Sequence, residues 1–366
     1  MSSTAASESP ANAPAGGPAQ ERSAPRHAAA VARDLIKRFL TAREGSIVIV
    51  TVLLTLYFAL SLPASSNFVT VANFQNLLPY FAPYAILAAG LVFVMINGEI
   101  DLSIGGVYLF TPLMFYEFYH GGIPLLPSVI LAIGVACAIG FINGFLVAVL
   151  NVASFIATLG TLFTASGLTL IVSHAEQLPM PGAAVTVNAS GGNHITTFAS
   201  VLGAGTYSEL IWALVIVVML QVALTRTRWG LHTIAVGSNR IAAAEAGVKV
   251  RWVLIRNFVA CAACAGLVGV LESVRTDSIS PDPGSATQLL LFAIAAAVIG
   301  GTLLAGGSGT VIGAMIGALF LGVLQDGLAI KGVNADYLLF YLGLAVLLAM
   351  LVNVYIGRVR RRSGVG

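Results

Sequence analysis

The segment Ser46–Leu62, "SIVIVTVLLTLYFALSL", decides the fold class, because it is mainly apolar and carries no charged residue. It lacks the apolar–polar alternation, over about ten residues, that marks a strand of a transmembrane β-barrel. Across all 366 residues, 58% are hydrophobic, 9% are charged and the mean hydropathy is +0.93, whereas a soluble domain has about 25% charged residues. Because backbone groups in lipid must pair within their own segment, these values predict an all-α, polytopic membrane helical bundle.

Further apolar runs predict about ten transmembrane helices, since a bilayer core about 30 Å thick needs about 20 helical residues per crossing. The run 154–173 fits either a span or a re-entrant segment. The predicted transmembrane domain covers residues 45–357. It follows a disordered tail at 1–44, which includes a short basic amphipathic helix, and precedes a basic tail at 358–366. The predicted spans are 46–62, 74–97, 100–119, 126–150, 154–173, 208–224, 252–274, 287–304, 308–330 and 337–356.

The basic residues predict the orientation of the spans, because cytoplasmic loops carry an excess of Lys and Arg. With a cytoplasmic N-terminus, 16 of the 18 basic residues fall inside or at the inner end of a span, and only Arg275 and Lys331 fall outside. Both termini are therefore predicted to be cytoplasmic. Since the basic residues lie beside membrane segments, the net charge of +3 does not indicate nucleic-acid binding.

Two long polar segments are predicted on opposite sides of the membrane. Residues 174–207 form an external segment rich in Gly, Ser and Thr, and residues 225–251 form an internal one. The internal segment is expected to contain a glycine turn and then a short helix, "NRIAAAEAG", which Asn239 caps and Gly247 ends. A short amphipathic helix inside an internal loop suggests a docking surface for a cytoplasmic partner.

The stretch "NGEIDLSIGG", Asn97–Gly106, sets two carboxylates between long uncharged runs. A carboxylate at bilayer depth costs roughly 2.5–3.5 kcal/mol, so it needs a partner or water. One interpretation is a broken helix lining a translocation path, with Asp101 as the N-cap of the next half-helix. The other is an ordinary inner turn with solvated acids. The candidate path residues are Asn97, Glu99, Asp101, Ser103, Asn143, Thr158 and Thr161. Residues such as the last three, taken singly, are more often interhelical hydrogen-bonding residues than ligand-binding ones.

A second glycine-rich stretch is "IGGTLLAGGSGTVIG", Ile299–Gly313. Small residues at such spacing let helices approach closely, so we expect a tight turn and a helix-packing face. The candidate packing residues are Gly300, Gly301, Gly306, Gly307, Gly309 and Gly313.

Several classes of catalytic site are excluded by the residues present. The lysines Lys37, Lys249 and Lys331 all follow Ile or Val, so the chain lacks the Gly-Lys pair of a phosphate-binding loop. The five histidines are scattered, and Cys261 and Cys264 are expected to pack on one helix face rather than bind metal. The sequence therefore predicts no metal, no cofactor and no enzyme, but a membrane passage.

Four ordered motifs resemble the permease subunits of the ribose, xylose and arabinose class of ABC sugar importers, over about residues 73 to 355. "GEIDLSIG" begins at Gly98, and "NGFLVAVLNVASFIATLGT" runs from Asn143 to Thr161. "AVGSNRIAAAEAGV" begins at Ala235 and carries Gly237, Asn239, Ala243, Ala244 and Gly247. The fourth motif is the stretch Ile299–Gly313.

This resemblance implies a type II ABC importer-like bundle in the bacterial inner membrane. It implies three kinds of protein partner: an ABC ATPase subunit, a periplasmic sugar-binding protein and a second permease copy, in a homodimer or heterodimer. The internal segment 225–251 would be the coupling segment, through Gly237, Asn239, Ala243, Ala244 and Gly247. The substrate implied is a monosaccharide or related polyol.

The chain departs from this family at Leu290–Ile294, where acids are common in relatives, and that departure leaves room for a different ligand. The nearer alternative is a permease of similar build for nucleosides or branched-chain amino acids. A secondary transporter that works without ATPases is the more distant one, and the docking-like segment 225–251 argues against it.

Overall fold

The computed structural model describes residues 45–351 apart from 64–66, 183–185, 188–192, 195, 335–336, 338 and 349. These residues belong to one compact unit, 43–366. The predicted tails at 1–44 and 358–366, with the basic amphipathic helix, lie outside the described residues.

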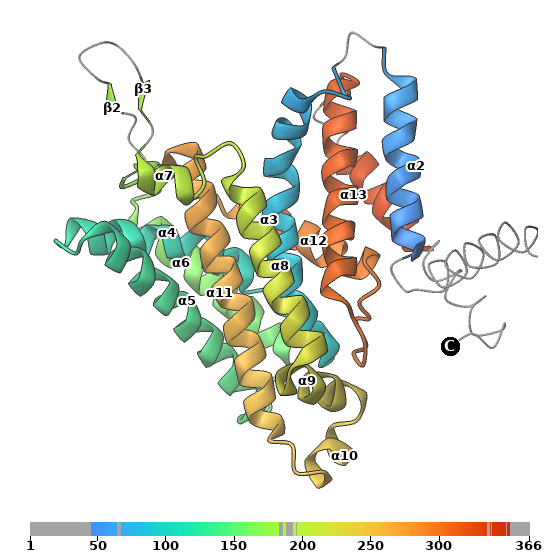
Figure 1. Ribbon diagram of the computed structural model, residues 1–366. Coiled ribbons are helices and arrows are strands. Elements are labelled where there is room, and N and C mark those ends of the chain that lie inside the picture. Colours follow the sequence, from blue (N-terminus) through green and yellow to red (C-terminus); the bar gives the residue numbers. More distant parts are fainter. Residues whose placement is uncertain are drawn as a thin grey trace, which may run out of the picture. The chain divides into compact units, whose positions relative to one another are not determined.

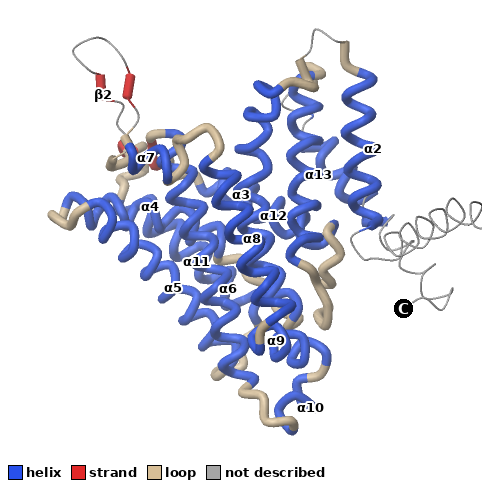
Figure 2. The backbone as a smooth tube through the Cα atoms, viewed as in Figure 1, coloured by secondary structure: helices blue, strands red, loops and turns tan. Residues whose placement is uncertain are grey.

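The described chain is almost entirely helical (Figures 1 and 2). Two short antiparallel pairs, β1 (Leu178–Pro179) with β4 (Ser278–Ile279) and β2 (Thr186–Val187) with β3 (Asn193–His194), are the strands within the described ranges. The helices are α2 (Gly45–Ser61), α3 (Val71–Ile96), α4 (Ile104–His120), α5 (Leu125–Ala148), α6 (Ser154–Val172), α7 (Thr197–Val201), α8 (Ser208–Arg226), α9 (Arg228–Ser238), α10 (Arg240–Glu245), α11 (Val250–Thr276), α12 (Pro283–Ile299) and α13 (Val311–Ile330), followed by an apolar helix at Leu339–Leu348.

The predicted class, an all-α polytopic membrane protein, is confirmed. Among the described residues, six helices are long and apolar enough to cross a membrane: α3, α5, α6, α8, α11 and α13. The shorter helices α2, α12 and Leu339–Leu348 are also apolar. Helix α6 is unbroken over 19 residues, which favours a span over a re-entrant segment at 154–173.

Helix starts follow the local sequence. Asn239 accepts hydrogen bonds from the amides of Ile241 and Ala242, as predicted, and begins α10. Thr70 and Asp282 cap α3 and α12 in the same way, and such a cap stabilises a helix by about 1 kcal/mol. Where the sequence predicts a glycine turn before "NRIAAAEAG", the chain instead forms α9, whose own N-cap is Thr227.

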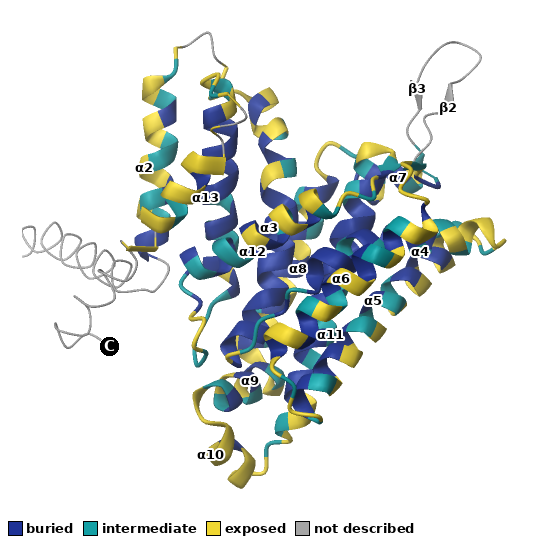
Figure 3. Ribbon diagram, turned by 180° about the vertical axis from the view of Figure 1, so that it is seen from behind, coloured by how far each residue is buried: buried dark blue, intermediate teal, exposed yellow. Residues whose placement is uncertain are grey.

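Three helices form the centre of the bundle. The most apolar windows of α3, α11 and α13 are 89%, 78% and 78% buried, whereas those of α5 and α6 are 28% and 33% buried. Figure 3 shows this contrast between the buried α3 and the partly exposed α5. Helix α13 packs along α3, and α11 packs along α3, α4 and α5. The free thiols of Cys261 and Cys264 lie buried in α11, where the Cys264 side chain and the Cys261 backbone face Gly90 of α3.

Helices α5 and α11 approach each other closely at two glycines. A Cβ atom on Gly140 would lie 2.7 Å from both Ala262 Cβ and the Phe258 carbonyl oxygen, and one on Gly144 would lie 2.7 Å from Ile255 Cα. Close helix contact in a membrane depends on such small residues, because lipid supplies no hydrophobic force between helices.

We expect Gly140→Leu to lower the stability of the protein, because forcing a side chain into a packed contact costs about 1–3 kcal/mol. Gly134→Leu is the matched control, since Gly134 lies on the same helix with open space around it. Thermal unfolding in detergent, followed by a fluorophore that reacts with the buried thiols of Cys261 and Cys264, measures both variants. Equal unfolding temperatures for the two variants would contradict the contact.

Candidate functional site

The stretch between α3 and α4, residues 97–103, is a break in the helical path through the bundle. Helix α4 begins at Ile104 and its N-cap is Ser103, so the prediction that Asp101 caps a half-helix is wrong. Asp101 is 0% exposed, which also excludes a solvated turn at this carboxylate. Its Oδ1 accepts hydrogen bonds from Ser103 N at 3.0 Å and Ser103 Oγ at 2.5 Å, and its Oδ2 has no hydrogen-bond partner.

Four of the seven predicted path residues form one hydrogen-bonded group, which we call the break cluster: Asp101, Ser103, Asn143 and Thr161. A fifth, Thr158, bonds the backbone beside this cluster. Asn143 Nδ2 donates to Ser103 Oγ at 2.8 Å, and Thr161 Oγ1 donates to Asn143 Oδ1 at 2.6 Å. Thr158 Oγ1 lies 3.4 Å from the Ile100 carbonyl oxygen, which accepts its hydrogen bond. The cluster therefore ties α5 and α6 to the start of α4.

The other two predicted path residues, Asn97 and Glu99, contact α9 and α10. Asn97 Nδ2 donates to the Thr233 carbonyl of α9 at 2.9 Å. Arg240 of α10 donates through Nη2 to the Asn97 carbonyl at 2.7 Å and to Glu99 Oε1 at 2.6 Å. The carboxylate of Glu99 is thus held by an ion pair with α10.

Asn257 of α11 completes this contact, and the sequence analysis missed it. It is 0% exposed, and its Nδ2 donates to Asn97 Oδ1 at 2.6 Å. Its Oδ1 accepts from Trp229 Nε1 of α9 at 2.6 Å. The available signal was one amide side chain inside the apolar run that follows Arg256.

The glycine-rich stretch and the end of α9 both touch the end of α3. Gly307 N donates to the Ile96 carbonyl at 2.7 Å, and a Cβ atom on Gly237 would lie 2.0 Å from the same oxygen. Gly300 and Gly313 pack backbone to backbone where α12 ends and α13 begins. The remaining predicted packing residues lie in the connecting loop: Gly301, Gly306, Gly307 and Gly309.

The predicted coupling residues surround α10. Gly237 and Asn239 lie at its start, Ala243 is buried and Ala244 is exposed. Gly247 follows its end with φ of +83°. All four motifs of the sequence therefore converge on the break between α3 and α4.

A polar cavity of about 740 Å³ lies toward the end of the bundle opposite α9 and α10. Its lining comes from the first half of α3, the last turns of α11 and α13, the first turns of α12, and Tyr108 of α4. The seven predicted path residues do not line it. The polar lining residues are Asn73, Gln75, Asn76, Tyr80, Tyr84, Tyr108, Glu272, Arg275, Ser285, Gln288, Gln325 and Asp326.

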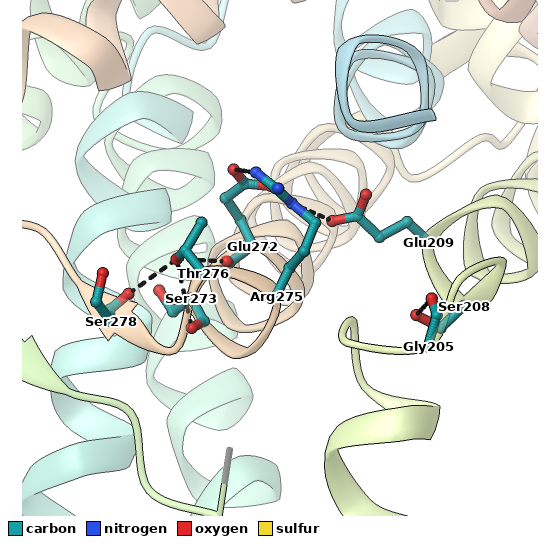
Figure 4. Close-up of polar contacts among 8 residues, drawn as sticks. All are labelled: Gly205, Ser208, Glu209, Glu272, Ser273, Arg275, Thr276 and Ser278. Carbon is teal, nitrogen blue, oxygen red and sulfur yellow. Dashed lines mark hydrogen bonds and ion pairs between the residues drawn. The ribbon is translucent and has the colours of Figure 1, made fainter. Parts of the chain in front are cut away.

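A charged group lies at the edge of this cavity, where Figure 4 shows Arg275 between two carboxylates. Arg275 binds Glu272 through two hydrogen bonds, and its Nε lies 3.3 Å from Glu209 Oε1 of α8. The Glu209 side chain is 6% exposed. These three residues were not predicted as site residues, although each is a charge inside or beside an apolar run.

Comparison with known proteins places these features in a family. Residues 73–354 match the family described as "Branched-chain amino acid transport system / permease component". The xylose/arabinose import permease protein of Sulfolobus acidocaldarius is 34% identical, over 89% of this chain and 87% of that protein. The ribose import permease protein of Escherichia coli is 33% identical, over 79% of this chain and 88% of that protein. The fructose import permease protein of Rhizobium meliloti is 29% identical, over 88% of this chain and 89% of that protein. No solved structure matches this chain at a significant level.

The break cluster generates a prediction about stability. We expect Asp101→Leu to destabilise the protein, because it leaves the Ser103 amide and hydroxyl without their acceptor, and a buried unpaired group costs about 1–3 kcal/mol. Asp101→Asn keeps an acceptor oxygen at this position and should unfold at or above the wild-type temperature. Thermal unfolding in detergent compares the two, and a Leu variant as stable as the Asn variant would refute the role of this acceptor.

Proposed function

The chain belongs to the family of branched-chain amino acid transport system permease components, and from this membership we propose that it is the membrane-spanning permease subunit of an ATP-driven ABC importer for a monosaccharide or related polyol. It is a multi-pass membrane protein and a transport component rather than an enzyme. ATP hydrolysis is assigned to separate ATPase subunits.

The sugar assignment rests on the relatives. The family description names branched-chain amino acids, but the relatives matched over most of this chain are named for xylose and arabinose, ribose, allose and fructose. The cavity lining supports a sugar as well, because amides, hydroxyls and tyrosines offer both donors and acceptors to a neutral hydroxylated solute. A branched-chain amino acid carries a charged amine and carboxylate on an apolar side chain, which this lining matches less well.

The segment formed by α9 and α10 is proposed to receive the ATPase. It presents exposed residues on α10, including Ile241 and Ala244. It also holds the end of α3, because Arg240 and the Thr233 carbonyl bind Asn97 and the Trp229 ring packs against Phe93. A displacement of this segment by ATPase closure would therefore reach the residues assigned to the translocation path, Asn97, Glu99, Asp101, Ser103, Asn143, Thr158 and Thr161, which are proposed to shape its inner end.

The orientation and assembly are part of the same proposal. Both termini are assigned to the cytoplasm, and α9 and α10 to the cytoplasmic face, because most basic residues lie on that side. The cavity then opens toward the side from which a periplasmic sugar-binding protein delivers its ligand. The complete importer contains a second permease copy, as a homodimer or a heterodimer, in the bacterial inner membrane.

Reconstituted transport tests this function. The permease is purified with the ATPase and the binding protein encoded beside it and placed in proteoliposomes, and uptake of labelled pentoses and hexoses is measured. We expect ATP-dependent uptake of at least one of these sugars that requires the binding protein. Uptake restricted to leucine or a nucleoside would favour the nearer alternative, and sugar uptake driven by an ion gradient without ATP would indicate a secondary transporter.

A second prediction concerns the coupling segment. Gly247→Val should weaken ATPase docking, because a β-branched residue is strained at the φ of +83° that ends α10. We expect recovery of the ATPase with the purified permease to fall several-fold, with transport falling in parallel.

The control for this variant is Gly332→Val. Gly332 follows α13 with φ of +74° and, like Gly247, has open space around its Cα, but it lies at the opposite end of the bundle. Gly332→Val should introduce similar backbone strain, but the amount of ATPase recovered with the purified permease should stay at the wild-type level. Equal ATPase recovery from the two variants would argue against docking at α10.

A further inference from the structure

We propose that the cavity between α3, α11, α12 and α13 binds the transported solute during passage, and that Gln325 accepts a hydrogen bond from one of its hydroxyl groups. The ligand class is a neutral polyhydroxylated molecule. This inference rests on the proposed transport function and adds to it a binding site and a residue that contacts the solute.

Gln325 carries the inference because its side chain is buried and only half paired. The residue is 5% exposed, lines the cavity, and lies 3.4 Å through Nε2 from the Tyr84 hydroxyl. Its Oε1 has no hydrogen-bond partner. A buried acceptor without a donor costs about 1–3 kcal/mol, so a turn of this amide that brings Oε1 to a donor on a ligand in the cavity is favoured. A sugar hydroxyl is such a donor.

The rest of the lining fits a polyol. Asn76, Gln288 and Ser285 supply side chains that both donate and accept hydrogen bonds. The rings of Tyr80 and Tyr84 add flat apolar surface with a hydroxyl at one end. The volume of about 740 Å³ falls within the range of roughly 300–1,000 Å³ that small-molecule sites occupy, so a monosaccharide fits with water around it.

The charges of the lining favour a neutral solute over a sugar acid or sugar phosphate. The charged lining residues are two carboxylates, Glu272 and Asp326, and one guanidinium, Arg275, which leaves a net charge of −1. Arg275 is already bound by Glu272 and paired with Glu209. Asp326 accepts from Asn73 Nδ2 at 2.7 Å. An anionic ligand would therefore meet carboxylates and a cation that is already neutralised.

Gln325→Met tests the proposal in the complete importer, because methionine keeps the length of the side chain and removes both polar atoms. Sugar uptake and ATP hydrolysis are measured in proteoliposomes at saturating sugar-loaded binding protein. We expect uptake per assembled complex to fall about tenfold, the value of one lost hydrogen bond, while ATP hydrolysis stays within about twofold of wild type. A purely structural role would lower both together.

Thr287→Val is the matched control, since Thr287 lies on α12 beside the cavity residue Gln288, is exposed and does not line the cavity. It should transport at the wild-type rate. Wild-type uptake by Gln325→Met, or a parallel loss of uptake and ATP hydrolysis, would overturn the inference. Absence of sugar uptake by the unmodified importer would instead refute the proposed function.

A second variant decides the question if Gln325→Met does not assemble. Gln288 of α12 is exposed and lines the cavity, so Gln288→Leu leaves the packed core unchanged. We expect uptake to fall about threefold, with ATP hydrolysis retained. Unchanged uptake by this variant would then overturn the assignment of the cavity.

Discussion

The constraint on which the structure depends is the hydrogen bonding of the helix break at Asn97–Ser103. A membrane protein tolerates irregular backbone at depth only where protein groups or water satisfy its polar atoms. Here the Ile96 carbonyl accepts from Gly307 N, the Asn97 carbonyl from Arg240, and Ile100 N donates to Ser154 Oγ. Each of these partners comes from a different part of the chain, so the break forms only when α6, α10 and the loop before α13 are all in place.

This requirement explains why the conspicuous sequence motifs lie together. Asn143 donates a hydrogen bond to the Ser103 hydroxyl, and Thr161 donates one to Asn143. Gly237, which has no side chain, permits α9 to reach the end of α3. Interhelical hydrogen bonds in membranes contribute only about 0.6 kcal/mol each on average. Their sum is therefore modest, and their main effect is to fix one arrangement of the break, since an unpaired buried group costs more than a formed bond contributes.

The sequence predicts the helical class and most spans because the apolar runs are long, and it predicts the start of α10 because Asn239 is a strong cap. It misplaces the end of α12, predicted at 304 and observed at Ile299, because "GGTLLAGG" remains apolar after the backbone of Gly300 meets that of Gly313. It also misses Asn257 and Gln325. A single amide in an apolar helix does not reveal whether it faces lipid, another helix or a cavity, and only the packing of α3, α11 and α13 decides this.

Helix α3 takes part in both polar regions, and this has a mechanical consequence. Its last residue lies against α9 and the loop before α13, while its first turns, with Asn73 and Tyr80, line the cavity. An α-helix of 26 residues is about 39 Å long, so a tilt of about 10° about one end displaces the other by roughly 7 Å. Helix α3 would thus act as a lever that is held at the end contacting α9. Pro79 and Pro83, in the half of α3 that lines the cavity, are the points where such a lever would bend rather than transmit the motion.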